Sequence, residues 1–181
     1  INVGISVSRV GSAAQTKLMK KVSGTLKLDL AQYRELAAFS QFASDLDAAT
    51  QRQLAKGERL VELLKQAQYQ PMTFAEQGLI IFAGTAKEGF VTSVPVSDVP
   101  RYEKELMDFV RTRHNDLLQE MQSVAALTDD IRAKLVEFNG LKILISAATH
   151  YRDIEAVRAA ADALVNFASS VAARGQLVRA G

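Results

Sequence analysis

The sequence has no cysteine, no tryptophan and only two histidines among its 181 residues. The lack of cysteine excludes disulfides and thiolate metal sites, and it gives no support for an oxidising compartment. His114 and His150 each lack a second nearby ligand, so no metal site is expected. The longest apolar runs, Gly78 to Gly84 and Leu141 to Ala148, are far shorter than the roughly 20 residues of a membrane-spanning helix.

Charge of one sign is not concentrated anywhere in the chain. The 22 basic and 20 acidic residues give a net charge of +2, and they are spread along the sequence. Nucleic acid is therefore not an expected partner, because its binding requires a basic patch or arm. With 48% hydrophobic and 23% charged residues, the composition is that of a folded protein, with room for one domain plus an appended element.

No motif indicates a complete active site. A phosphate-binding loop needs a glycine-rich turn followed by Lys and a hydroxyl residue, but Gly84-Thr-Ala-Lys-Glu-Gly89 continues into two apolar residues. Gly4-Ile-Ser-Val-Ser8 has serine where a nucleophile elbow requires its second glycine. Asp129 and Asp130 are better explained as helix-start residues than as an acid–base pair. A free-standing enzyme is therefore disfavoured.

The first nine residues, Ile1 to Arg9, alternate apolar and polar side chains with the period of a half-buried strand. One strand is not stable by itself, and every later segment has a helical pattern. The predicted fold class is therefore mainly α, a helical bundle preceded by one orphan β-strand. This mismatch suggests a truncated chain.

Apolar residues at helical spacing predict amphipathic helices over Leu26–Ala43 and about Ala48–Gln66. Gly57, inside the second, costs roughly 1 kcal/mol relative to alanine and favours a kink or break there. Thr73-Phe-Ala-Glu76 forms a capping box that starts a short apolar helix through about Phe82.

Pro100 suits the first turn of a long helix that reaches about Ser123. Thr128, followed by two aspartates, is the signal for the start of another helix. A final amphipathic segment ends near Gly175. The predicted buried face of the long helix consists of Val99, Tyr102, Leu106, Phe109, Val110, Leu117 and Met121.

Several separated motifs resemble the alpha subunit of rotary ATP synthases, and they occur in the family's order. They are INVGISVSRVGSAAQ at residues 1–15, LAQYRELAAFSQFASDLD at 30–47, LVELLKQAQYQPM at 60–72 and RYEKEL at 101–106. The resemblance covers about residues 1–138 and implies three parts. Residues 1–24 would end a nucleotide-binding domain, residues 25–138 would form the helical C-terminal domain, and residues 139–181 would be a helical extension of unknown role.

The resemblance implies functional residues whose sites are completed by other segments. Arg9 matches the family's arginine finger, which acts in trans on the gamma-phosphate in the beta subunit's catalytic site. A guanidinium suits this role because it is always charged and offers a planar fork of donors. Gln66 and Gln68 match the glutamines that border the adenine of the alpha subunit's own non-catalytic nucleotide. Without the resemblance, Arg9 is a salt-bridging residue and the glutamines are a polar helix end.

Ser44, Asp45 and Asp47 match the loop that faces the rotating central stalk, and the same pattern is typical of a helix capped by aspartate. The implied cofactors are ATP or ADP with Mg in the intact complex, none of them bound tightly by this chain alone. The implied partners are the beta subunits and the central-stalk gamma subunit.

The same resemblance implies a location peripheral to an energy-transducing membrane. The bacterial plasma membrane, at its cytoplasmic face, is favoured over the mitochondrial inner membrane and the thylakoid. An alternative function is a non-catalytic helical interaction module, whose apolar C-terminal segment from Leu141 onward binds a protein partner.

Overall fold

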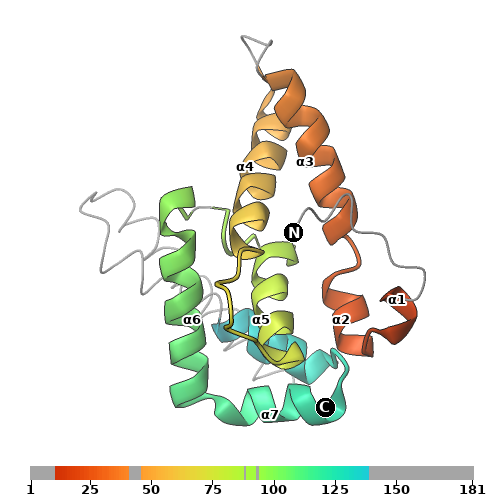
Figure 1. Ribbon diagram of the computed structural model, residues 1–181, viewed down its shortest axis with the longest axis vertical. Coiled ribbons are helices and arrows are strands. Elements are labelled where there is room, and N and C mark those ends of the chain that lie inside the picture. The colour runs from red at the N-terminus through yellow and green to blue at the C-terminus, as the bar shows by residue number, and fades with distance from the viewer. Residues whose placement is uncertain (1–10, 41–45, 88, 93, 139–181) are drawn as a thin grey trace, which may run out of the picture. The chain divides into compact units, whose positions relative to one another are not determined.

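The computed structural model describes residues 11–40, 46–87, 89–92 and 94–138, which form helices and their connections (Figure 1). These described residues contain no strand, which confirms a mainly α fold. The predicted strand at residues 1–9 and the predicted extension at 139–181 lie outside them. The helices are α1 Gly11–Ala14, α2 Lys17–Val22, α3 Leu26–Ser40, α4 Ala48–Leu63, α5 Phe74–Thr85, the 3-10 turn η1 Val96–Asp98, α6 Val99–Arg113 and α7 Asn115–Val124.

Helices α3 and α4 form an antiparallel hairpin and lie side by side (Figure 1). Two polar contacts join them. The ammonium of Lys56 lies 2.9 Å from Oδ2 of Asp29, and Gln53 Nε2 donates to Gln32 Oε1 at 2.6 Å. Both helices were expected from their apolar spacing.

Helix α4 runs through Gly57, so of the predicted kink or break, the break is wrong. The glycine is buried against α3, where a Cβ added to it would lie 2.3 Å from Cγ of Tyr33 and 2.4 Å from its Cβ. The position lacks a side chain because the aromatic ring of α3 occupies the space. Gly57 is therefore a packing residue that allows close helix approach.

Helix α5 is buried along most of its length and contacts α2, α4 and α7. The capping box between Thr73 and Glu76 is confirmed, and the helix continues to Thr85, a little beyond the predicted end. Its buried residues are Ala75, Glu76, Gly78, Leu79, Ile80, Phe82, Ala83 and Gly84. An apolar helix surrounded on several sides is the core of this unit.

The single long helix predicted from Pro100 to about Ser123 is wrong, because the chain bends at His114. His114 has φ −140° and ψ 38°, outside the helical region. The amide of His114 still donates to the carbonyl of Val110 at 2.9 Å, so α6 ends there and α7 begins at Asn115. The bend lets α6 pack on α4 while α7 packs on α5.

Helix α2 was not expected from the sequence. Thr16 caps it by accepting from the amide of Met19 at 3.2 Å, and Leu18 and Val22 are buried. The hydroxyl of Thr85 in α5 donates to the carbonyl of Val22 at 2.9 Å. The helix is short, but these contacts join it to the core.

The helix expected after Thr128 is confirmed over residues 129–138. The hydroxyl of Thr128 accepts from the amide of Ile131 at 3.2 Å, which is the expected cap. Ile131 and Leu135 are fully buried. Across the described part of the chain, no helix combines the length and apolar character that a membrane span needs.

We predict that Gly57→Ala lowers the stability of the full chain by about 1–3 kcal/mol, since the added methyl overlaps the near end of the Tyr33 side chain. Better helix propensity would return only about 1 kcal/mol. Urea denaturation followed by circular dichroism measures the change. In a Tyr33→Gly background, which removes the ring and also the Cβ that would lie 2.4 Å away, the same substitution should be neutral or stabilising. A higher urea midpoint for Gly57→Ala alone would contradict the packing role.

Candidate functional site

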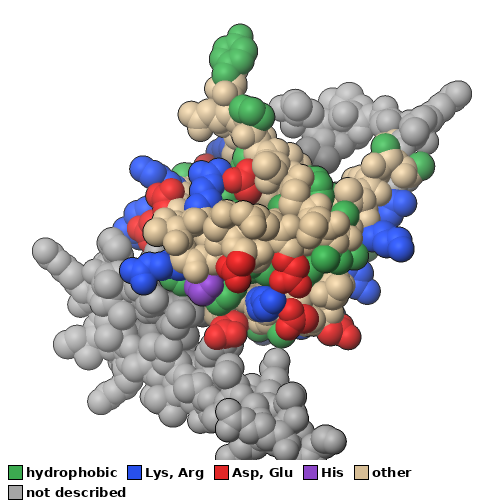
Figure 2. All heavy atoms as spheres, turned by 90° about the horizontal axis from the view of Figure 1, so that it is seen from below, with side chains coloured by type: hydrophobic (Ala, Val, Ile, Leu, Met, Phe, Trp, Pro, Cys, Tyr) green, Lys and Arg blue, Asp and Glu red, His purple; other side chains and the backbone are tan. Residues whose placement is uncertain are grey.

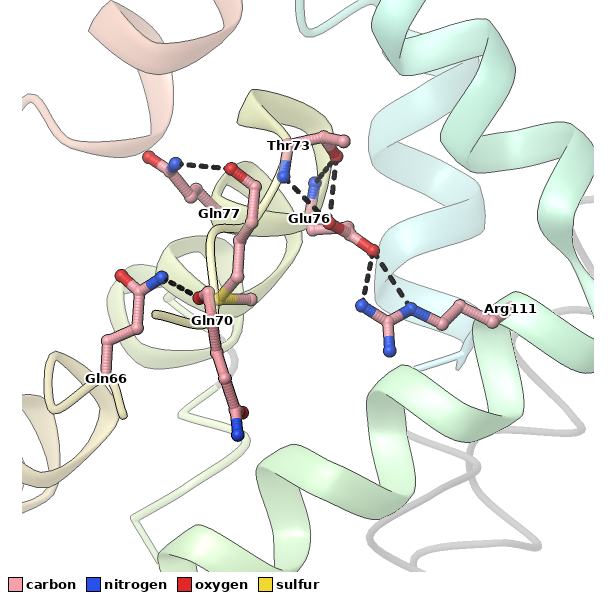
Figure 3. Close-up of polar contacts among 7 residues, drawn as sticks. Gln66, Gln70, Thr73, Glu76, Gln77 and Arg111 are labelled. Carbon is pink, nitrogen blue, oxygen red and sulfur yellow. Dashed lines mark hydrogen bonds and ion pairs between the residues drawn. The ribbon is translucent and has the colours of Figure 1, made fainter. Parts of the chain in front are cut away.

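Residues 65–72, between α4 and α5, form a segment that we call the glutamine loop. Gln66 and Gln68 are both exposed on it. The amide nitrogen of Gln66 donates to the carbonyl of Gln70, which closes the loop (Figure 3). Tyr69, at the turn, is 91% exposed and has φ 61°. The loop thus presents the amide side chains of Gln66 and Gln68 on a tight turn, with the exposed Gln70 beside them. The carbonyl oxygen of Gln66 is not used in its internal bond.

The exit of the glutamine loop is tied to the first turn of α5 (Figure 3). The amide of Thr73 donates to Glu76 Oε2 at 2.8 Å, and the Thr73 hydroxyl donates to the same oxygen at 3.1 Å. One residue further on, Gln77 Nε2 donates to the carbonyl of Met72 at 2.9 Å. The end of the loop is therefore hydrogen-bonded at two consecutive residues.

Helix α6 contacts the same carboxylate through Arg111. The guanidinium donates from Nε at 2.9 Å and from Nη2 at 2.6 Å, both to Glu76 Oε1 (Figure 3). The Glu76 side chain is 11% exposed and that of Arg111 is half exposed. Burial alone would raise the pKa of Glu76, but the hydrogen bonds from Arg111 and Thr73 outweigh it and hold that pKa below the ordinary value.

A groove of about 440 Å³ lies between the glutamine loop and α6. Glu103 lines it, and burial raises the pKa of that carboxyl. The groove mixes cations, anions, amides and apolar groups, so it has no single-sign field. Its lining consists of Lys65, Gln66, Ala67, Gln70, Pro71, Met72, Pro100, Glu103, Lys104, Met107, Asp108 and Arg111.

Charge on the wider surface is mixed as well. The face drawn in Figure 2 carries both basic and acidic side chains. This agrees with the even distribution of charge along the sequence.

Asp47 caps the N-terminal end of α4, and the glutamine loop follows the C-terminal end of the same helix. Its Oδ1 accepts from the amides of Ala49 at 2.8 Å and Thr50 at 3.0 Å. The Thr50 hydroxyl donates to Oδ2 at 2.7 Å, and this bond, with those from the backbone amides, lowers the pKa of Asp47. The predicted helix cap is confirmed.

The predicted site residues do not form one site. Helix α4 has 16 residues, a length of about 24 Å, and it separates Asp47 from Gln66. Arg9, Ser44 and Asp45 lie outside the described residues. Among the residues that the structure does describe, no cluster of three or more His, Asp or Glu could hold a metal ion.

The ion pair between Glu76 and Arg111 was missed at the sequence level. Its two residues are 35 positions apart, and no periodic pattern links them. The capping box marked Glu76, but only as a helix-start residue.

The sequence matches a family model described as ATP synthase alpha/beta chain, C terminal domain, over residues 15–140. The match therefore includes every helix from α2 to α7 and the whole glutamine loop. The description names alpha and beta chains together.

We predict that Glu76→Gln destabilises the full chain at pH 7 by about 1 kcal/mol, a modest cost because Arg111 is half exposed. The folded state lowers the pKa of Glu76, so its contribution is complete above the ordinary value of 4.5 and is lost as the pH falls below it. Urea denaturation of both proteins at pH 7 and at a pH well below 4.5 should show the difference shrinking.

Glu103 supplies a control of opposite sign. Burial raises its pKa, so its ionised form costs stability above the ordinary pKa. Glu103→Gln should therefore be neutral or stabilising at pH 7. Equal losses for both variants would show that the Glu76 result reflects only a lost carboxyl charge.

Proposed function

The chain belongs to the family of ATP synthase alpha/beta chains and carries their C-terminal domain, and we propose that it is the C-terminal part of an alpha subunit in an F-type complex. The observation that carries this proposal is the glutamine loop. Two amides, Gln66 and Gln68, stand exposed on a turn whose exit is fixed by Thr73, Glu76 and Arg111. Their sequence context resembles that of alpha subunits.

The role of the loop is to border the adenine of a non-catalytic nucleotide. An amide offers a donor and an acceptor, and the edge of adenine has both. Gln66 already uses its nitrogen within the loop, so its carbonyl oxygen is the acceptor for the exocyclic amine. The groups that would hold the phosphates and Mg are not among the described residues. Other segments would therefore complete the binding site for ATP or ADP.

Arg9 is the proposed arginine finger. The Val7-Ser-Arg9-Val-Gly11 context supports this role, because it resembles the segment that carries the finger in alpha subunits. In the assembly its guanidinium would reach the gamma-phosphate in the catalytic site of a beta subunit. There it would offset the charge that develops on the transferred phosphoryl group.

The tip of the α3–α4 hairpin is the proposed contact with the central-stalk gamma subunit. In the sequence, Ser44 and Asp45 come between α3 and the Asp47 cap of α4. Firm capping of α4 by Asp47 supports this role, because it gives the loop one fixed end. The complex as a whole would be peripheral to an energy-transducing membrane, with the cytoplasmic face of a bacterial plasma membrane favoured.

The alternative function, an interaction module that acts through its C-terminal amphipathic segment, rests on residues outside the described part. It stays a prediction from the sequence. It also concerns residues beyond those matched by the family model, which end at 140.

We predict that Arg9→Lys, placed in the full complex, lowers steady ATP turnover by on the order of 10³-fold. Lysine keeps the charge but loses the planar fork of donors. Assembly and nucleotide binding should be largely preserved, which gel filtration and nucleotide titration can check. Near-normal turnover would exclude the arginine-finger role.

We predict that the isolated chain has no ATPase activity and binds nucleotide weakly or not at all. The sequence has no phosphate-binding loop motif, and the adenine contacts alone would provide little affinity. Isothermal titration calorimetry with Mg-ATP measures this directly. Tight binding would contradict the proposal that neighbouring segments complete the site.

A further inference from the structure

The glutamine loop holds a backbone conformation that is costly for its sequence. Tyr69 has φ 61°, and the left-handed region costs a non-glycine residue roughly 1–2 kcal/mol. Such a conformation persists only when the surrounding structure fixes it. Residues 66–70 are themselves exposed, so burial of their side chains does not provide this. The constraint must come from the hydrogen bonds within the loop and at its exit.

At the exit, two residues of α5 hold two consecutive positions, Met72 and Thr73. Gln77 binds the carbonyl of Met72, and Glu76 binds both the amide and the hydroxyl of Thr73. Figure 3 shows these bonds beside the Gln66 to Gln70 closure. The closure and the exit are thus separated by only Pro71, whose ring restricts φ.

Glu76 does more than an ordinary capping box requires. A capping box uses the glutamate to bind the backbone of the cap residue, and here Oε2 alone does this. The second oxygen, Oε1, accepts both bonds from Arg111 of α6. One carboxylate therefore links the loop exit, the start of α5 and the side of α6. Arg111 also lines the groove beneath the glutamine loop.

We infer that Glu76 and Arg111 are positioning residues for the glutamine loop, fixing the orientation in which Gln66 and Gln68 meet a purine base. The inference rests on the proposed function for the identity of the ligand. Glu76 acts on the loop through its bonds to Thr73, and Arg111 acts through Glu76. Their loss should loosen the loop and reduce base selectivity.

The loop can be observed without nucleotide. The chain has no cysteine, so Ala67→Cys provides a single site for a nitroxide spin label, and the exposed Ala67 side chain makes it accessible. In the full chain, Glu76→Gln and Arg111→Gln should each raise the mobile fraction of the electron paramagnetic resonance spectrum about twofold or more. Circular dichroism checks that each variant is folded.

Glu120→Gln is the matched control. It removes an ion pair of 2.9 Å between Glu120 and Lys134, in a different part of the same unit. It should leave the label spectrum unchanged. Arg111→Lys keeps the charge without the fork and should give an intermediate spectrum. If both Glu76→Gln and Arg111→Gln leave the spectrum unchanged, the positioning role is overturned.

Base selectivity is measured in the assembled alpha–beta complex, by titrating ATP and GTP at the non-catalytic site. Glu76→Gln should weaken ATP binding about threefold to tenfold and narrow the preference for ATP over GTP. Glu120→Gln should change neither quantity. Glu76→Gln could raise the mobile fraction of the label spectrum and yet leave ATP affinity and the preference for ATP over GTP unchanged. If Gln66 and Gln68 contribute to ATP binding, that result would overturn the claim that Glu76 positions them for the base.

The double variant Gln66→Ala, Gln68→Ala tests that proviso and separates the two proposals. If it weakens ATP binding, the nucleotide role stands and the Glu76→Gln result decides the positioning role. If it leaves ATP binding unchanged, the nucleotide role fails, while the label spectrum still decides whether Glu76 and Arg111 hold the loop.

Discussion

The burial of α5 is the constraint on which the rest of the described unit depends. Leu79 and Ala83 are fully buried, and Phe82 is nearly so, because α2, α4 and α7 pack around this helix. A helix that is apolar on several faces is stable only when neighbours cover it. Its first residue, Phe74, follows the glutamine loop almost directly. The place where α5 begins therefore determines where the exposed amides stand.

Glu76 is the one charged residue of α5, and its position in the helix allows the carboxylate to be buried. It lies in the first turn, where the helix dipole favours a negative charge, and Arg111 and Thr73 supply hydrogen bonds to both carboxylate oxygens. Burial of a carboxylate without such partners would be strongly unfavourable. Thr73, Glu76 and Arg111 thus stabilise the start of the buried helix and also hold the exit of the glutamine loop.

Local signals predicted the helices and caps that depend on nearby residues. The caps at Asp47, Thr73 and Thr128 each involve side chains within three positions of the amides they bind, so sequence alone could identify them. The bend at His114 and the continuity through Gly57 depend on tertiary packing instead. Val110 and Leu117 are seven positions apart, so the helical phase is kept across His114 although residues 111–116 include no apolar side chain. The space at Gly57 is set by Tyr33 on another helix.

The candidate site was predicted in the same uneven way. Gln66 and Gln68 came from a motif in the sequence, whereas the pairing of Glu76 with Arg111 spans two helices and has no local signature. The finer assignments, an alpha subunit with Arg9 as its finger and Ser44 and Asp45 at the stalk, depend on residues outside the described ranges. They remain predictions because no contact within the described unit bears on them.

The close contact between Gly57 and Tyr33 also has an evolutionary consequence. A ring that fills the space of a missing side chain makes the two positions dependent on each other. Among related sequences, a larger residue at the position of Gly57 should occur together with glycine at that of Tyr33, since even the Cβ of Tyr33 lies 2.4 Å from the added Cβ. The two positions, one on each helix of the hairpin, should therefore vary as a pair.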